Sequence, residues 1–212
     1  MDDYQAYLKF VNHRKWFNKL WLSEKMQYNC GPCGIAPNNS GWYIVRPIYN
    51  LSGMSLGASK LWIPSDDYSR VPPGYFWCQW FEGTQTSTTY RWSDGQWVAQ
   101  HCWKATRDHS NLSKFVKWQR NSNRDQYKTL PSFFNQLSDV KLINVEHVGD
   151  KIIEVHLRDT PDPCYDEIVP IWSSGQNEVE YYTKLGYKWV SSYEDADGFL
   201  HDPRLGFMVK NY

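Results

Sequence analysis

The sequence has no excess of either charge and no long apolar run. Its 212 residues include 23 Lys+Arg and 23 Asp+Glu, which gives a formal net charge of zero. A chain without a basic excess has no bulk attraction for nucleic acid or an anionic membrane, so any anion binding must be local. No apolar run approaches the roughly 20 residues of a membrane span, and the opening MDDYQAYLKF lacks the basic-then-apolar order of a signal peptide. We therefore expect a cytoplasmic protein that does not bind nucleic acid or enter a membrane.

Cysteine is too scarce, and odd in number, for a disulfide framework. The chain has five cysteines, and two of them, Cys30 and Cys33, form a C-x-x-C pair with the Gly-Pro insert of some thiol oxidoreductases. The segment that follows, residues 35–41, is rich in turn residues rather than helical. No second C-x-x-C or C-x-x-H completes a zinc site. We therefore interpret Cys30 and Cys33 as loop residues without a redox or metal role.

Internal repeats and low-complexity linkers are also absent, which favours one compact unit over residues 1–212. The hydrophobic content of 41% is enough for one sizeable core or for two small lobes around a cleft. Twelve Trp and fifteen Tyr suit a core, an interface or a base-stacking surface equally well. We interpret these aromatic residues as core and cleft lining, because zero net charge argues against a stacking surface for single-stranded nucleic acid.

The periodicity of apolar residues predicts a mixture of helices and antiparallel strands. Helical spacing predicts one or two amphipathic helices over residues 4–28 and short helices over 130–139 and 178–185. Runs rich in β-branched and aromatic residues predict strands at 42–48, 74–81, 86–92, 97–103 and 167–172. Turn residues predict loops at 49–59, 159–163 and 191–203. The predicted fold class is α+β with an antiparallel meander in the middle of the chain.

A hairpin over residues 142–158 carries the most informative side chains. Its strands are joined by a turn at Gly149-Asp150. Side chains alternate between the two faces of a strand, so polar residues at even-numbered positions lie on one face if neither strand carries a bulge. These residues are Asn144, Glu146, Glu154, His156 and Arg158. The hairpin is a candidate metal and anion site. The alternative is a half-exposed sheet whose outer face is merely charged.

Two further segments are candidates for anion binding. The strand WYIVRPI ends with Arg46 and a proline, and the loop after it, YNLSGMSLGAS, has backbone N–H groups that could cradle phosphate. The alternative is an ordinary hairpin loop with glycines at its turn positions. Lys104 and Arg107 follow the last strand of the meander, where they would face either a cleft or solvent.

The order of these segments from about Gly41 to Arg158 resembles the ATP-grasp superfamily, over somewhat more than half of the chain. The resemblance implies antiparallel sheets with flanking helices, which form two lobes around a nucleotide cleft. It divides the single unit into a helical N-terminal segment (1–40), a lobe with the glycine loop and the hinge (41–103), and a metal-binding lobe with a C-terminal extension (104–212).

The resemblance also implies roles for individual residues. The nucleotide-binding set consists of a cation before proline, the glycine loop, the hinge to adenine and a ribose contact, and it maps to Arg46, Ser52, Gly53, Met54, Gly57, Gln79, Trp80, Phe81 and Gln85. The set for Mg²⁺ is Glu146, Glu154 and His156. Arg158 would neutralise charge on the transferring phosphoryl group, and Lys104 and Arg107 would bind a substrate carboxylate or acyl phosphate.

The implied activity is an ATP- and Mg²⁺-dependent ligase that activates a small-molecule or peptide carboxylate as an acyl phosphate for attack by an amine. Three positions depart from the superfamily pattern, since Arg46 replaces lysine, Gln85 replaces glutamate and His156 replaces asparagine. The usual N-terminal substrate domain is missing or reduced to the helices before Gly41, so a protein partner could supply the acceptor site. The alternative is therefore an inactive nucleotide-binding module within a larger assembly, such as that of a large tailed phage, whose proteins the aromatic-rich sequence resembles.

Overall fold

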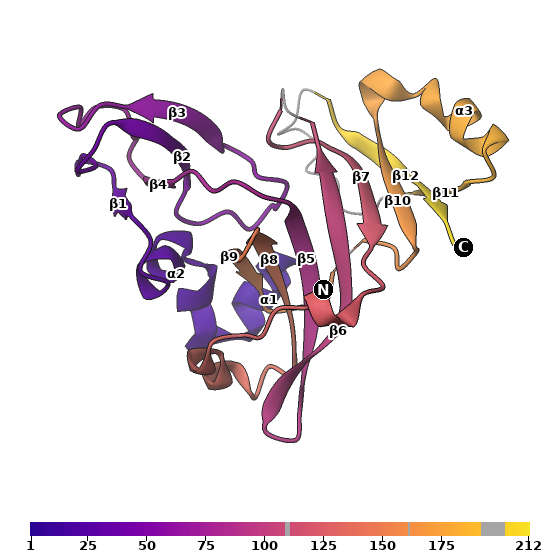
Figure 1. Ribbon diagram of the computed structural model, residues 1–212, viewed down its shortest axis with the longest axis horizontal. Helices are drawn as coiled ribbons and strands as arrows, with labels where there is room; N and C mark the ends of the chain where they lie inside the picture. The colour runs from indigo at the N-terminus through magenta and orange to yellow at the C-terminus, as the bar shows by residue number, and fades with distance from the viewer. Residues whose placement is uncertain (109–110, 161, 192–201) are drawn as a thin grey trace.

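The computed structural model describes residues 1–108, 111–160, 162–191 and 202–212 and contains two antiparallel sheets (Figure 1). The smaller sheet has the strand order β1-β4-β2-β3. Its strands are β1 (Cys30–Pro32), β2 (Gly41–Pro47), β3 (Ser59–Ile63) and β4 (Tyr75–Gln79). A core of Tyr43, Val45, Ile63, Val71 and Trp77 lies against one face of this sheet.

The larger sheet has the strand order β11-β12-β10-β7-β6-β5-β8-β9 within the described residues. Its strands are β5 (Gln85–Ser93), β6 (Gln96–Arg107), β7 (Phe115–Arg120), β8 (Leu142–Val148), β9 (Lys151–His156), β10 (Glu167–Trp172), β11 (Lys188–Ser191) and β12 (Arg204–Lys210). Each neighbouring pair runs antiparallel. In Figure 1 the two sheets stand side by side, with β8 and β9 at the edge of the large sheet that faces the small one.

Short helices cover the β8–β9 edge of the large sheet. The N-terminal region contains α1 (Asp3–Lys9), the 3-10 helix η1 (Val11–Phe17) and α2 (Lys19–Lys25). Asp2 caps α1 through a capping box with Gln5. The remaining helices are η2 (Arg124–Gln126), η3 (Ser132–Leu137), η4 (Ser173–Gly175) and α3 (Glu178–Lys184). Among the described residues, none of the helices has the length and apolar character that crossing a membrane requires.

A single hydrophobic cluster joins the N-terminal helices to the hairpin β8–β9. Its members are fully or nearly fully buried and come from α1, η1, α2, β5, η3, β8, β9 and the segments beside them: Ala6, Trp16, Phe17, Leu22, Tyr90, Phe134, Leu137, Val140, Ile143, Val145, Ile152, Val155 and Leu157. Burial of such side chains stabilises by about 1.5–3 kcal/mol each. The N-terminal segment is therefore part of the core on which the candidate site is built.

The predicted α+β class with antiparallel sheets is confirmed, and so is the hairpin over 142–158. Several details differ from the expectation. Residues 4–28 form three short pieces, and the predicted helix at 130–139 is the 3-10 helix η3. The expected boundary near residue 103 lies inside β6, a strand of the large sheet. Most of the predicted loop at 191–203 lies outside the described residues.

Cys30 is not a loop residue as expected. It lies in β1 and is the direct cross-strand partner of Cys78 in β4, whereas Cys33 lies in the turn after β1, as predicted. The strand β1 has only three residues, so it shows no periodicity that a sequence could reveal. The turn-rich segment after Cys33 also favoured a loop.

Candidate functional site

Two adjoining cavities lie where the small sheet, the large sheet and α1 meet. The larger has a volume of about 410 Å³ and extends along one face of the large sheet. The smaller has a volume of about 70 Å³ and lies between the two sheets. Ser55 of the glycine loop and Glu154 of β9 line both cavities. A ligand that spans both cavities would therefore pass between this loop and this strand.

The two cavities collect most of the residues predicted for the site. The larger is lined by Ser52, Gly53, Met54, Gln85, Glu146, Glu154, His156 and Arg158. The smaller is lined by Arg46, Trp80, Phe81, Arg107 and Glu154. Three predicted residues line neither cavity: Gly57, Gln79 and Lys104.

Those three residues have other contacts in the structure. Lys104 Nζ donates to Gln126 Oε1 at 2.7 Å, at an exposed position. Gln79 Oε1 accepts a hydrogen bond of 3.0 Å from the backbone N–H of Asn29. A side chain at Gly57 would lie 2.7 Å from the hydroxyl of Tyr75, and the φ of Gly57 is +75°. Glycine is required there by the backbone conformation.

Two guanidinium groups face the smaller cavity. Arg46 Nη2 donates to the carbonyl oxygen of Ile153 at 2.8 Å. The Nε atoms of Arg46 and Arg107 are buried and have no hydrogen-bond partner among the described residues. Burial lowers the pKa of Arg107; Glu146 raises it and the nearby Arg46 lowers it further. Two half-buried guanidinium groups with unused Nε donors form a candidate site for an anion.

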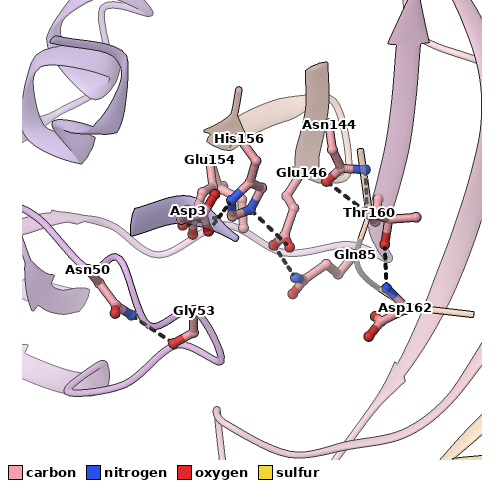
Figure 2. A network of polar contacts seen from close by, with 12 residues as sticks. Asp3, Asn50, Gly53, Gln85, Asn144, Glu146, Glu154, His156, Thr160 and Asp162 are labelled. Atoms are coloured by element: carbon pink, nitrogen blue, oxygen red, sulfur yellow. Dashed lines mark hydrogen bonds and ion pairs between the residues drawn. The ribbon is translucent and has the colours of Figure 1, made fainter. Parts of the chain in front are cut away.

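The glycine loop between β2 and β3 is held in an unusual backbone conformation. The φ angles of Gly53, Met54 and Ser55 are 68°, 54° and 51°. Only glycine adopts this left-handed region without cost, so Met54 and Ser55 are strained. The side chain of Asn50 ties the loop to itself, because its Nδ2 donates to Gly53 O at 2.9 Å (Figure 2). Strain of this kind is concentrated at ligand-binding segments.

The polar face of the hairpin is formed as the parity of its residues predicted. Glu146 and Glu154 are direct cross-strand partners, and so are Asn144 and His156. The bulge in the hairpin comes after Glu146 and leaves these pairs in register. Figure 2 shows the ring of His156 between Asp3 on one side and Glu146 on the other. His156 Nε2 lies 3.7 Å from Glu146 Oε1 and 3.8 Å from Glu154 Oε1.

Asp3, which no sequence motif indicated, organises this face. Asp3 is 3% exposed. Its carboxylate accepts hydrogen bonds of 2.8 Å from both Nε and Nη2 of Arg158. It also accepts one of 2.9 Å from His156 Nδ1 (Figure 2). Such a bidentate pair fixes the plane of the guanidinium. In the sequence, Asp3 is only an acidic residue at the start of a capped helix. That pattern indicates where the helix begins, but it does not indicate a partner far along the chain.

The charges in this cluster shift each other's pKa values. Burial alone would raise the pKa of Asp3, but His156 and Arg158 outweigh it and hold that pKa well below its usual range. For His156, burial lowers the pKa, yet the Asp3 carboxylate and the hydrogen bonds to Asp3 and Glu146 raise it to about 10, against the opposing charge of Arg158. His156 is therefore an imidazolium at neutral pH.

Contacts with Lys19 and Gln85 extend the network to both sides. Lys19 Nζ of α2 lies 2.8 Å from Glu154 Oε1. Burial would raise the pKa of Glu154, but Lys19, His156 and Arg46 lower it. On the other side, Gln85 Nε2 donates to Glu146 Oε2 at 2.8 Å, and Arg107 donates to Gln85 Oε1. The network thus connects the two cavities.

The donor set for a metal ion is small. Within the described part of the chain, no group of three or more His, Cys, Asp and Glu side chains is arranged to hold a metal ion. The predicted ligand His156 is occupied by Asp3 through Nδ1, and an imidazolium has no lone pair to offer a metal. Nucleotide-bound Mg²⁺ usually takes only one or two protein carboxylates, with phosphates and water as its other ligands. The pair Glu146 and Glu154 fits that requirement.

Comparisons with solved structures find proteins of similar fold. Carboxyaminoimidazole ribonucleotide synthase from Aspergillus clavatus, complexed with ATP, matches with a TM-score of 0.59 and 10% identity over 99% of this chain and 74% of that one. N5-carboxyaminoimidazole synthetase from Staphylococcus aureus, complexed with ADP, matches with a TM-score of 0.56 and 9% identity over 93% of this chain and 69% of that one.

A third match is the ADP complex of PurK, with a TM-score of 0.57 and 10% identity over 99% of this chain and 74% of that one. No protein-family model matches the sequence, and a search of curated proteins finds no relative. At these identities the likeness establishes the fold. The chain has the ATP-grasp fold that the order of its motifs resembled.

Proposed function

We propose that the protein is a cytoplasmic, ATP- and Mg²⁺-dependent ligase that activates a carboxylate for attack by an amine. The observation that carries the proposal is the pair of adjoining cavities, which share Ser55 and Glu154 and are lined by most of the predicted site residues. The bound ATP and ADP of the structural neighbours support it.

The adenine ring would lie in the smaller cavity, beside the hinge residues Trp80 and Phe81. The phosphates would pass between Ser55 and Glu154 toward the larger cavity. The unused Nε donors of Arg46 and Arg107 support this placement, because a phosphate oxygen would satisfy both. The larger cavity would then hold the γ-phosphate and the two substrates.

Glu146 and Glu154 would hold Mg²⁺ together with the nucleotide phosphates. The bound ion would neutralise phosphate charge and orient the transferring group. His156 would act as a positive charge between Asp3 and the two glutamates rather than as a ligand. Arg158, held in one plane by Asp3, would stabilise negative charge on the transferring phosphoryl group.

The proposed reaction has two steps. A carboxylate oxygen of the first substrate attacks the γ-phosphorus, the bond to the β,γ-bridging oxygen breaks, and ADP leaves. The amine of the second substrate then attacks the carbonyl carbon of the acyl phosphate. A C–N bond forms, inorganic phosphate leaves, and the amine loses a proton.

Calorimetric titration with ATP, with and without Mg²⁺, tests the proposal. We expect Mg²⁺-dependent binding that weakens about tenfold or more in Glu146→Gln, because a carboxylate ligand of the ion is lost. Glu180→Gln is the matched control, since Glu180 pairs with Lys184 on the exposed face of α3, away from both cavities. The proposal is wrong if ATP does not bind, or if both variants bind it equally.

A second candidate function is a nucleotide-binding module without turnover, acting with a protein partner. The observation that favours it is the buried pairing of Glu154 with Lys19, which already neutralises one carboxylate of the metal pair. This candidate predicts ATP binding without release of ADP or phosphate in mixtures of carboxylates and amines. Phosphate release that requires both a carboxylate and an amine would exclude it.

A further inference from the structure

The half of the larger cavity far from the glycine loop is lined mainly by aromatic and apolar side chains. We call this lining the aromatic wall, and it consists of Trp103, Phe115, Trp118, Ile168, Pro170 and Trp172. Trp103 and Trp118 are 4% and 8% exposed, so the wall is firmly packed. The indole N–H of Trp103 donates to Tyr165 O at 2.9 Å, which fixes the ring.

The aromatic wall lies on the same face of the large sheet as the carboxylates. Cross-strand pairing places Trp103 of β6 opposite Ser87 of β5, and Ser87 opposite Glu146 of β8. Direct partners in a sheet share a face. Trp118 of β7 is in turn opposite Ile168 of β10. The wall is thus one continuous surface with the proposed reaction centre.

An ion pair adjoins the wall, because Arg204 of β12 is the cross-strand partner of Trp172. Arg204 Nη1 lies 3.5 Å from Asp162 Oδ1, and both side chains line the cavity, with exposures of 12% and 27%. Burial raises the pKa of Asp162; Arg204, Arg158 and His156 lower it and Glu146 raises it, so this carboxylate is close to the charged cluster. Figure 2 shows Asp162 beside Thr160 and on the same side of the site as Gln85 and Asn144.

We propose that this half of the cavity binds an aromatic α-amino acid as the amine substrate. Its ring would pack on the aromatic wall, its carboxylate would pair with Arg204, and its amino group would face Asp162, next to the reaction centre. A zwitterion matches a site that presents one cation and one anion side by side. This assignment rests on the proposed function, because it takes the amine component of that reaction as the occupant.

A cationic ligand fits the wall less well than a neutral ring. Two cations of the protein already lie over aromatic rings in or beside the wall. Lys114 Nζ lies 5.3 Å from the centroid of the Trp172 ring, and the Arg204 guanidinium lies 4.4 Å from that of Phe207 in β12, next to the wall. A further cation would meet their repulsion, whereas an uncharged ring would stack on the remaining faces.

Calorimetry with a set of probes tests the proposal in the wild-type protein. The probes are L-phenylalanine, L-alanine, 3-phenylpropionate and phenethylamine, each titrated with and without Mg²⁺ and ADP. We expect L-phenylalanine to bind at least about tenfold more tightly than the other three, because each of them lacks the ring, the ammonium or the carboxylate. Equal binding of L-alanine, or no binding of L-phenylalanine, would overturn the proposal.

Variants then test the ion pair. Arg204→Gln should weaken L-phenylalanine binding about tenfold or more, because a charge-assisted hydrogen bond is lost. The matched control is Arg120→Gln, which removes an arginine that pairs with Asp166 and does not line the cavity. Equal affinities in the two variants would contradict the assignment. If ATP binds with Mg²⁺ but L-phenylalanine does not, only this inference fails, since nucleotide binding is measured separately.

Discussion

The hairpin β8–β9 and the glycine loop face each other across the site, yet they are held in opposite ways. The hairpin's charged residues contact partners far along the chain, since Asp3 is 153 positions from His156 and 155 from Arg158. The hydrogen bonds of Asn50, Gly53 and Ser55 instead stay within their own loop. The charges of the hairpin are thus fixed by distant partners, whereas the hydrogen bonds at the tip of the loop are local.

This difference indicates which half is ready before a ligand binds. A buried charge cluster keeps its geometry because removing any member leaves another charge unpaired. At the tip of the loop, left-handed Met54 and Ser55 are held by short-range hydrogen bonds. We therefore expect the hairpin to supply fixed charges and the loop to adapt to the phosphates. The predictions below test this contrast.

The largest effect is expected for Asp3→Ala. Without this carboxylate, Arg158 and His156 are left buried without their counter-ion, and we expect the free energy of unfolding to fall by about 3–5 kcal/mol. Asp2→Ala is the matched control, because it removes only the cap of α1 and should cost about 1 kcal/mol. Urea denaturation of the two variants measures the difference. Equal losses would mean that the hairpin does not depend on Asp3.

The pH dependence of stability tests the same cluster without breaking it. The pKa of His156 is raised from 6.5 to about 10 on folding, so its stabilising contribution is complete below pH 6.5 and is lost as the pH rises toward 10. The pKa of Asp3 is lowered, so its contribution is present above its unfolded value of 3.8 and is lost as the pH falls below that value. The groups that face His156 are Asp3, Arg158, Glu146 and Glu154.

We therefore expect a stability maximum between about pH 4 and pH 6.5 in the wild-type protein. The His156→Gln variant should have a lower free energy of unfolding than the wild type at pH 6. Its free energy of unfolding should also fall much less as the pH rises above 6.5. The measurement is the free energy of unfolding from urea titrations at several pH values. An alkaline decline of the same steepness in both proteins would show that His156 is not charged in the folded state.

The position of the glycine loop and the shared face of the hairpin's polar residues could be predicted from the sequence. The parity of Glu146, Glu154 and His156 placed them on one face because strand side chains alternate, and the glycines marked the loop. The strand predicted at 97–103 ends one residue before Lys104, so its alternation did not predict the face of Lys104. Since β6 continues to Arg107, Trp103 and Lys104 fall on opposite faces of the sheet.

The ion pairs between the N-terminal helices and the hairpin could not be predicted from the sequence. The pairing of Lys19 with Glu154 and of Asp3 with Arg158 depends on how the N-terminal helices dock on the hairpin. Nothing in the spacing of single residues specifies that docking. Five strands of the described residues were also not predicted: β1, β3, β7, β11 and β12. Of these, β3 and β7 are short and carry exposed or half-exposed lysines, Lys60 and Lys117, which weaken a β-propensity pattern.

The smallest effect is expected in the glycine loop, at Met54. Its φ of 54° costs about 1–2 kcal/mol in a non-glycine residue, and glycine relieves this at an entropic cost of about 0.5–1 kcal/mol. Met54→Gly should therefore keep or slightly raise the free energy of unfolding, by up to about 1 kcal/mol. Met54→Val should lower it by a similar amount, because a β-branched residue tolerates this conformation poorly. If glycine is as harmful as valine, the Met54 side chain rather than its backbone holds the loop, and the loop is more firmly anchored than its local hydrogen bonds indicate.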